Sequence, residues 1–419
     1  MSYYILPKKH IKIEINPTLS TGPPVKLKPV ISQSIVSYLS ETETNLSNLS
    51  PIEYSIEFIR KIANPYEFIF SKVPGSKFSV SKLKPFSNTF YVIYELFSTF
   101  NLLESMTNRN ITAIHYAANS AASIECLSMF REDKNDINYS LELTNNFATN
   151  GLRPNSADFL YFEINSGTSI GSDIDTSSDY IIELIVVVCN ILSYQNSQGI
   201  CIIKVDTLFY KPVLDILFIL TSLYDKVSII KPNTSDINNN DRYLVCKHFN
   251  HNSSQNNSSK MTESFVNLLN EVINNKYFIH SLIKSELPYY FLNKVEDSNI
   301  IIAHQQIEFM DQIISLVKHK NRMDKIESLK KTNIQKCIQW CEKFKIPNNK
   351  FAEKVNIFLP IVIYDEHHLL DDDAFIKLND DTDTDTDTDI AIENKKDANI
   401  LTDLVLVDSN DEACIHSMM

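Results

Sequence analysis

Between residues 111 and 249 the chain alternates between two hydrophobic patterns. Short apolar or β-branched runs typical of buried strands lie at 111–117, 158–164, 199–205, 226–232 and 242–249. Amphipathic or strongly apolar helical stretches separate most of them, at 122–130, 178–194 and 212–224. This alternation predicts an α/β fold, with a mainly parallel sheet and helices on both faces. No helical stretch separates the last two strands, so we expect them to pair antiparallel at one edge.

Helical patterns also precede this region. Ser50, Pro51 and Glu53 fit the start of a helix, as cap, first helical position and capping-box partner. A second helix is predicted from about 88 to 103, because its aromatic residues share one stripe. These residues are Phe90, Tyr94, Phe97 and Phe100.

The pattern changes twice more after the last strand. An Asn- and Ser-rich linker at 250–259 leads into a helical stretch at 262–345, which has room for three or four helices. The stretch DDTDTDTDTD near the end cannot bury apolar surface and is expected to be disordered. The sequence therefore predicts an N-terminal arm, a central α/β domain, a helical extension and an acidic disordered tail, at 1–49, 50–250, 260–364 and 371–419.

The distribution of charge along the chain bears on whether the protein could bind nucleic acid. The 419 residues carry a formal net charge of −13, but residues 365–419 alone hold 17 Asp and Glu against 3 Lys. The rest of the chain is close to neutral, so the acidic total does not argue against a nucleic-acid partner. Residues 318–350 are basic, with ten Lys and Arg against three acidic residues. This stretch could contact RNA phosphates or form an ordinary solvated face.

Cysteines and apolar runs indicate the compartment. The seven cysteines are odd in number, and several lie in apolar runs, which favours free thiols in a reducing environment. The opening MSYYILPKKH lacks the layout of a secretory signal, and the run 180–192 is too short to span a bilayer. We therefore expect a soluble intracellular protein without a membrane partner or a metal site.

The segment 199–249 carries the most specific motif. A strand ends in Lys204, a helix begins near Lys211, the next strand ends in Lys-Pro, and KPNTSDINNNDRYLV (231–245) leads into the final strand. This order resembles the C-terminal half of FtsJ-like (RrmJ-type) RNA 2′-O-methyltransferases of large DNA viruses. The resemblance implies a Rossmann-like methyltransferase fold with a helical C-terminal extension, S-adenosylmethionine as cofactor, and RNA, including capped mRNA, as substrate.

The resemblance also implies catalytic positions. Such enzymes use a Lys-Asp-Lys-Glu set to position and deprotonate a ribose hydroxyl. Lys204 matches the central lysine, Asp241 stands where the glutamate is usual, and Glu163 is the carboxylate nearest the aspartate position. The first lysine position is occupied by Val92. On the residues alone, Lys204 lies either in a present or former site or at the sheet edge with its ammonium in solvent.

The predicted cofactor loop departs from the pattern. Where the family has a glycine pair, this chain reads AANSAAS (117–123), with alanines at both glycine positions. By resemblance, the cofactor would lie against Ala117, Asn119, Ser120, Ala121 and Ala122. The alternative interpretation is a plain helix start capped by Asn119 or Ser120. Glycine normally allows the close backbone approach that such a ligand needs, so the alanines indicate an impaired site.

Three hypotheses follow. The first is a catalytically impaired methyltransferase homologue that binds RNA or a viral protein partner, the second an active cap 2′-O-methyltransferase, and the third a structural protein of a virion or viral factory. All three place the protein in the host cytoplasm, a viral factory or a virion.

Overall fold

The computed structural model describes residues 1–8, 13–21, 27–49, 55–144, 152–164, 174–250, 255–318, 322–349, 351–353 and 404–406. The chain divides into two compact units. Unit 1 combines Met1–Asn48 with Pro85–Gln312, and unit 2 combines Leu49–Lys84 with Ile313–Met419.

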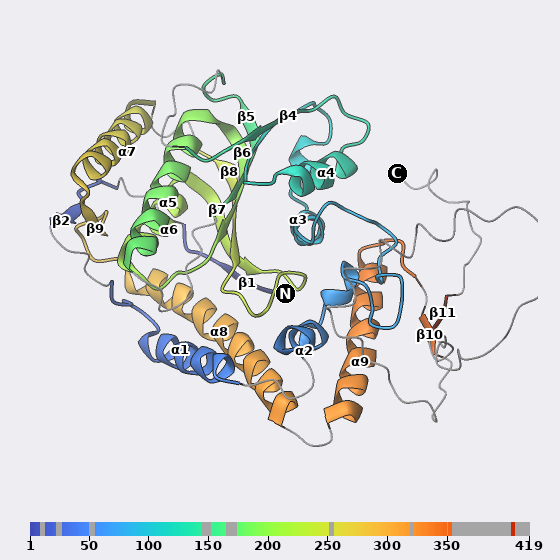
Figure 1. Cartoon of the computed structure of the whole chain (residues 1–419). Coiled ribbons are helices and arrows are strands. Elements are labelled where there is room, and N and C mark those ends of the chain that lie inside the picture. The colour runs from blue at the N-terminus through green and yellow to red at the C-terminus, as the bar shows by residue number, and fades with distance from the viewer. Residues whose placement is uncertain are drawn as a thin grey trace, which may run out of the picture. The chain divides into compact units, whose positions relative to one another are not determined.

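Unit 1 is built on a seven-stranded sheet (Figure 1). The strand order is β1-β7-β8-β6-β5-β3-β4, in which β4, β3, β5 and β6 run parallel to one another. The bounds are β1 Ser2–Ile5, β3 Thr112–Tyr116, β4 Ile137–Leu141, β5 Ala157–Glu163, β6 Gln195–Val205, β7 Tyr224–Lys231 and β8 Arg242–Phe249. The mainly parallel sheet with an antiparallel last strand confirms the predicted Rossmann-like methyltransferase fold class.

The antiparallel end of the sheet differs in one respect from the prediction. β8 lies between β6 and β7 and runs antiparallel to both. As predicted, the last two strands of the series pair antiparallel, but they do not form the edge. That place belongs to β1, which pairs antiparallel with β7 from Ser2↔Lys231 to Ile5↔Ser228. The prediction of the edge was wrong because so short a strand leaves little pattern in the sequence.

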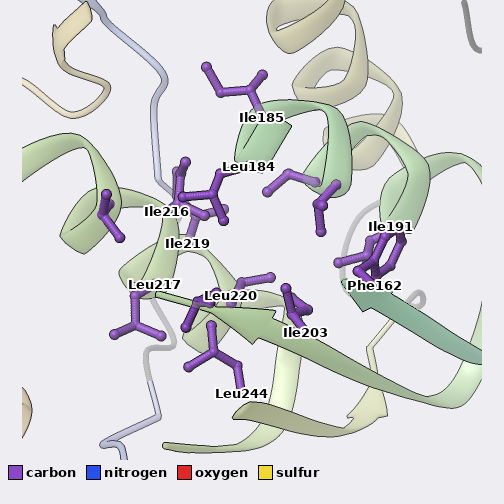
Figure 2. Close-up of a cluster of buried hydrophobic side chains, with 14 of the residues drawn as sticks. Phe162, Leu184, Ile185, Ile191, Ile203, Ile216, Leu217, Ile219, Leu220 and Leu244 are labelled. Atoms are coloured by element: carbon purple, nitrogen blue, oxygen red, sulfur yellow. The ribbon is translucent and has the colours of Figure 1, made fainter. Parts of the chain in front are cut away.

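Helices cover both faces of the sheet (Figure 1). On one face lie α3 (Thr89–Phe100) and α4 (Ala121–Phe130), where Phe97 contacts Phe159 of β5 edge-to-face. On the other lie α5 (Ile174–Tyr194) and α6 (Lys211–Leu223), whose aliphatic side chains form the main hydrophobic core with Phe162, Ile203 and Leu244 (Figure 2). Burying this many apolar side chains provides most of the driving force for folding.

The remaining elements of unit 1 surround this core. The arm predicted at 1–49 contributes β1, a short strand β2 (Thr18–Ser20) that pairs with β9 (Phe278–Ser281), and a helix α1 (Gln33–Ser47) that the sequence pattern had not indicated. A 3-10 turn, η2, spans Glu104–Met106. The helical stretch begins with α7 (Gln255–Asn275) and continues with α8 (Tyr289–Lys318).

Unit 2 pairs two helices. α2 (Ile56–Ala63) is capped by Ser55, whose hydroxyl accepts a hydrogen bond from the amide of Phe58 at 3.1 Å. The predicted start at Ser50 and Pro51 lies outside the described residues. η1 (Glu67–Ile69) follows, and α9 (Arg322–Lys343) packs against both, with Asn333 donating to the carbonyl of Ile62 at 2.8 Å. β10 (Phe351–Glu353) and β11 (Leu404–Leu406) pair antiparallel.

Two further predictions concern the cysteines and the membrane. Six cysteines are free and buried, as expected, and Cys414 lies outside the described residues together with most of the acidic tail. No helix among the described residues has the length and apolar character needed to cross a bilayer.

Candidate functional site

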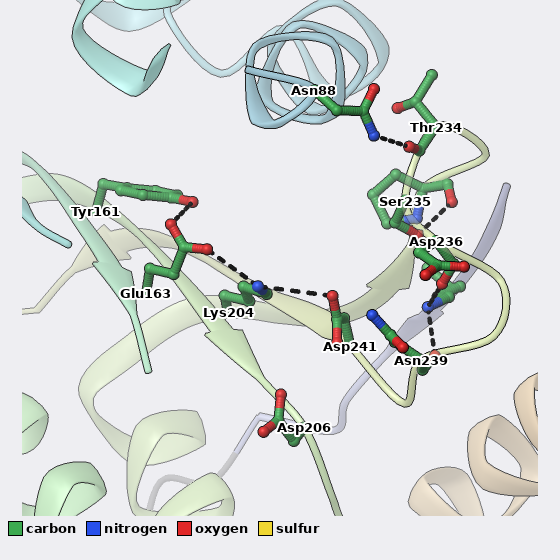
Figure 3. A network of polar contacts seen from close by, with 12 residues as sticks. Asn88, Tyr161, Glu163, Lys204, Asp206, Thr234, Ser235, Asp236, Asn239 and Asp241 are labelled. Atoms are coloured by element: carbon green, nitrogen blue, oxygen red, sulfur yellow. Dashed lines mark hydrogen bonds and ion pairs between the residues drawn. The ribbon is translucent and has the colours of Figure 1, made fainter. Parts of the chain in front are cut away.

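Lys204 is held between two carboxylates (Figure 3). Its Nζ lies 3.0 Å from Oε1 of Glu163 and 3.6 Å from Oδ2 of Asp241. Glu163 is the last residue of β5 and pairs directly with Lys204 of β6, while Asp241 immediately precedes β8. The structure therefore brings together the three residues that the sequence placed at the catalytic positions. Their catalytic role stays a prediction.

The strand alternation explains why these side chains meet. Glu163 and Lys204 occupy paired positions on parallel strands, and Tyr243 of β8 pairs with Lys204, so all three side chains point to the face that α3 and α4 cover. Buried Tyr161, two residues before Glu163, donates its hydroxyl to Glu163 Oε2 at 3.4 Å. The cluster thus sits at the carboxyl ends of the parallel strands, where open α/β sheets bind ligands.

The charges around Lys204 set its protonation. Burial alone would lower the pKa of Lys204, but the nearby carboxylates of Asp241 and Glu163 outweigh it, and the pKa is raised above its usual value. Lys204 is therefore an ammonium ion at neutral pH. It can donate hydrogen bonds to a hydroxyl or phosphate oxygen, but it cannot accept a proton in this state.

A second lysine organises the loop between β7 and β8. Lys231, at the end of β7, is buried and donates to the carbonyls of Asp236 at 2.7 Å and Asn239 at 2.8 Å. Burial lowers the pKa of Lys231 to about 8, although Asp241 and Asp236 oppose this effect. These two hydrogen bonds hold the β7–β8 loop, which ends with Asp241 beside Lys204.

Glu95 fixes the same loop from the opposite side. This α3 residue is buried, and its Oε2 accepts hydrogen bonds from the amide of Thr234 at 3.1 Å and from its hydroxyl at 3.0 Å. Asn88, at the start of α3, donates to the carbonyl of Thr234 at 2.9 Å (Figure 3). Sequence reasoning missed both Glu95 and Lys231. A carboxylate in the otherwise apolar run YVIYELF was the available signal.

The predicted first lysine position holds no polar group. Val92 is buried within α3, at 3% exposure. The nearby lysines Lys82 and Lys84 are exposed and belong to unit 2 rather than to this helix. The lysine set implied by the resemblance is therefore incomplete in this chain.

The loop after β3 lies at the same edge of the sheet, because β3 is the parallel neighbour of β5. It is also where the strand order reverses, with β4 on one side of β3 and β5 on the other, and such switch points are common binding sites. Of the predicted cofactor residues, Ala117, Ser120 and Ala122 are buried, Ala121 is half-buried and Asn119 is exposed. They adjoin the strands that carry Glu163 and Lys204.

This loop does not fit the carboxylate of S-adenosylmethionine. Two of its polar groups already have partners: the amide of Ala121 donates to Asn119 Oδ1 at 3.2 Å, and the hydroxyl of Ser120 lies 2.5 Å from that of Ser140 on β4. None of residues 117–123 has a positive φ. The loop thus adopts an ordinary helix start, as the alternative interpretation held, and lacks the glycine backbone that would bring amides close to a ligand.

One feature of the region would suit a nucleoside. Glu142, exposed directly after β4, follows the loop by about the 20 residues at which an acidic side chain commonly binds ribose hydroxyls. The sequence analysis missed Glu142 because it did not recognise β4, whose alternating pattern INYSL is short and only weakly apolar.

The buried side chain of His115 connects β3 to the start of α4 through hydrogen bonds. His115 of β3 contacts the hydroxyl of Ser123 through Nδ1 at 2.8 Å and Asn138 Oδ1 through Nε2 at 3.4 Å. Burial lowers the pKa of His115 to about 4, so the ring is neutral at physiological pH. Ser123 in turn donates to the carbonyl of Ser120 at 2.8 Å, which connects the histidine to the loop.

Comparison with known proteins gives matches among solved structures alone. No family model matches the chain, and no curated protein matches it. Among solved structures, the chain is similar to a protein named as a ribosomal RNA methyltransferase from Plasmodium falciparum, with 15% sequence identity and a TM-score of 0.32. The match covers 39% of this chain and 97% of that one. At this identity and TM-score it assigns neither a family nor an activity to this protein.

Proposed function

We propose that this chain is a catalytically impaired homologue of RNA 2′-O-methyltransferases that acts by binding RNA. The contact of Lys204 with Glu163 and Asp241 carries the proposal, because it reproduces most of a ribose-positioning set at the carboxyl edge of the sheet. An ammonium between two carboxylates can orient a hydroxyl through hydrogen bonds without any transfer chemistry.

Two observations support the impaired state. In the loop 117–121 the amide of Ala121 and the hydroxyl of Ser120 already have partners, and no residue has the positive φ of a glycine turn, so the loop is poorly suited to a methyl donor. Lys204 is charged at neutral pH and the position of the first lysine is the buried Val92, so neither lysine position supplies a neutral amine that could act as a base. RNA remains the partner class that the ribose-handling arrangement favours.

The active methyltransferase is the second candidate, favoured by the same three residues at Lys204. Calorimetric titration with S-adenosylmethionine separates the two. We expect no binding at micromolar cofactor, and no transfer of a radiolabelled methyl group to capped or uncapped RNA. Micromolar binding together with methyl transfer that is lost in Lys204→Met would overturn the impaired assignment and establish the enzyme.

Binding of RNA by the full chain is the second part of the test. We expect the full chain to bind labelled single-stranded RNA with an affinity that falls as salt increases, as binding to phosphates requires. The proposal would be contradicted if the protein bound neither RNA at low salt nor the cofactor. That result would favour a structural role.

A further inference from the structure

Unit 2 presents a lysine-rich loop with exposed aromatic side chains. From Phe68 to Tyr94 the sequence contains four lysines and no acidic residue. Lys72, Lys77, Lys82 and Lys84 are all exposed, and none of them forms an ion pair among the described residues. Phe70 precedes Lys72 and Phe78 follows Lys77, and these two rings are 39% and 41% exposed. The exposed ring of Phe78 beside these cations needs a physical explanation.

The loop is firmly held in place. Gly75, with a φ of 83°, makes the turn, and the amide of Val73 donates to the carbonyl of Phe78 at 3.0 Å. Farther along, Val80 donates to the carbonyl of Phe68 at 2.7 Å, which fixes the loop to η1. The side chains of Phe78 and Lys77 are therefore displayed from an ordered backbone. A preorganised surface of this kind loses less entropy on binding.

The end of α9 extends the same basic surface. Lys82 donates its backbone amide to the carbonyl of Pro347 at 2.9 Å, and Ser81 forms a β-bridge with Asn348. This contact brings the loop beside the segment that carries exposed Lys343 and Lys345. Within unit 2, residues 55–84 and 322–349 together hold 13 Lys and Arg against 5 Asp and Glu. The positive charge thus extends over both of these stretches and is not confined to one loop.

The site in unit 1 has the opposite charge. Glu163, Asp206 and Asp241 are the charged groups nearest Lys204, so the cluster repels a phosphate chain instead of attracting one. An RNA-binding role therefore requires positive charge from elsewhere in the molecule. Lysines that track a phosphate backbone, combined with exposed rings on which bases stack, are the features of single-strand binding surfaces.

We infer that the surface formed by residues 70–84 and the C-terminal end of α9 binds single-stranded RNA. The lysines contact phosphates, and Phe70 and Phe78 stack against unpaired bases. This inference rests on the proposed function, which it deepens by assigning the RNA contact to unit 2. A duplex, whose bases are already stacked, gains only the phosphate contacts.

Fluorescence anisotropy on the full chain tests the assignment, with a labelled oligouridylate of about 20 nucleotides and an RNA duplex of matched length. The variant Lys72→Glu/Lys77→Glu/Lys82→Glu should weaken single-strand binding at least tenfold. It should also reduce the slope of log Kd against log salt by about 2, since each single-strand phosphate contact contributes about 0.7. The matched control Lys28→Glu/Lys226→Glu/Lys284→Glu makes the same charge change at exposed positions of unit 1.

Stacking is tested separately. Phe78→Ala should weaken the oligouridylate about fivefold or more and leave the duplex unchanged, whereas Tyr289→Ala, at a more exposed aromatic in unit 1, should affect neither. The inference would be overturned if the two triple lysine variants lost the same affinity for single-stranded RNA. It would also be overturned if Phe78→Ala weakened duplex and single-strand binding equally. Neither result would contradict RNA binding by the protein as such. If the unaltered protein binds no RNA, the proposed function fails as well. Circular dichroism verifies that each variant is folded.

Discussion

Glu95 and Thr234, 139 residues apart in the sequence, are joined by two hydrogen bonds to one carboxylate oxygen. Both residues are buried, and the bonds attach α3 to the loop that precedes Asp241. The position of Asp241 beside Lys204 thus depends on a helix that begins far earlier in the chain.

Removing this carboxylate should destabilise unit 1. In Glu95→Ala the amide and hydroxyl of Thr234 lose their partner in a buried site, which we expect to cost about 2 kcal/mol of unfolding free energy. Urea denaturation measures the loss. The control Glu132→Ala removes an exposed glutamate and should change stability by less than about 0.5 kcal/mol. Equal stability of the two variants would contradict the anchoring role.

Lys204 should contribute to stability as well as to the site. Lys204→Met leaves Glu163 and Asp241 partly buried without their cation, and we expect a loss of about 1–3 kcal/mol in urea denaturation. Lys204→Arg keeps the positive charge and should lose less. Equal stability of Lys204→Met and the unaltered protein would show that solvent screening leaves the ion pairs of Lys204 with no measurable contribution to the free energy of unfolding.

His115 should make stability depend on pH in the acid range. Burial lowers the pKa of His115 from 6.5 to about 4, so between these values the unfolded chain binds a proton that the folded protein does not. The contribution of His115 to the free energy of unfolding is fully present above pH 6.5. It decreases by up to about 3 kcal/mol as the pH falls to 4.

Denaturation of the unaltered protein and of His115→Gln at several pH values between 4 and 7 isolates this contribution, because the other titrating groups are common to both. The unaltered protein should lose more stability on acidification. Parallel pH profiles would show that His115 is protonated in the folded state.

The acidic tail should weaken RNA binding at low salt. Residues 371–419 carry 15 Asp and Glu against 3 Lys, so their removal brings the net charge of the chain from −13 close to zero. We expect severalfold tighter binding of single-stranded RNA at low salt and little change at high salt, where charges are screened. Anisotropy titrations at two salt concentrations measure the effect. A full-length variant with Asn for the six Asp of DDTDTDTDTD removes about half of this net charge and should shift the affinity in the same direction by a smaller factor. Unchanged affinity in both variants would exclude repulsion by the tail.

The sheet was largely predictable from the sequence, since its central strands are continuous apolar runs. β8 spans the predicted 242–249, and its neighbours differ by a few residues. The missed elements lack such a signal: β4 is exposed along much of its length, and α1 is rich in Ser and Thr, with Leu39 and Leu46 among its few buried residues. Local pattern does not reveal strands or helices that tertiary packing stabilises.

The residues around Lys204 were predictable from the resemblance, which assigned Glu163, Lys204 and Asp241 to catalytic positions. Glu163 ends β5 and Lys204 is the last residue but one of β6, and parallel pairing places them side by side. Glu95 and Lys231 gave no comparable signal, because their partners are backbone or hydroxyl groups in a loop whose path the sequence does not reveal. The alanines at 117–123 lead into α4 without a positive φ, as the helix-start alternative expected, although the Ser120 side chain forms no capping hydrogen bond; the cofactor contacts stay a prediction.

The pairing of β1 with β7 has a consequence for how the protein assembles. Residues 2–5 reach their partners only after more than 200 further residues have been synthesised. Until then the backbone groups of β1 have no sheet to join, and the outer edge of β7 stays open afterwards until β1 arrives. The sheet of unit 1 therefore cannot close this edge until β7 has been synthesised, and a chain with residues 2–5 deleted should expose β7 to pairing with other chains.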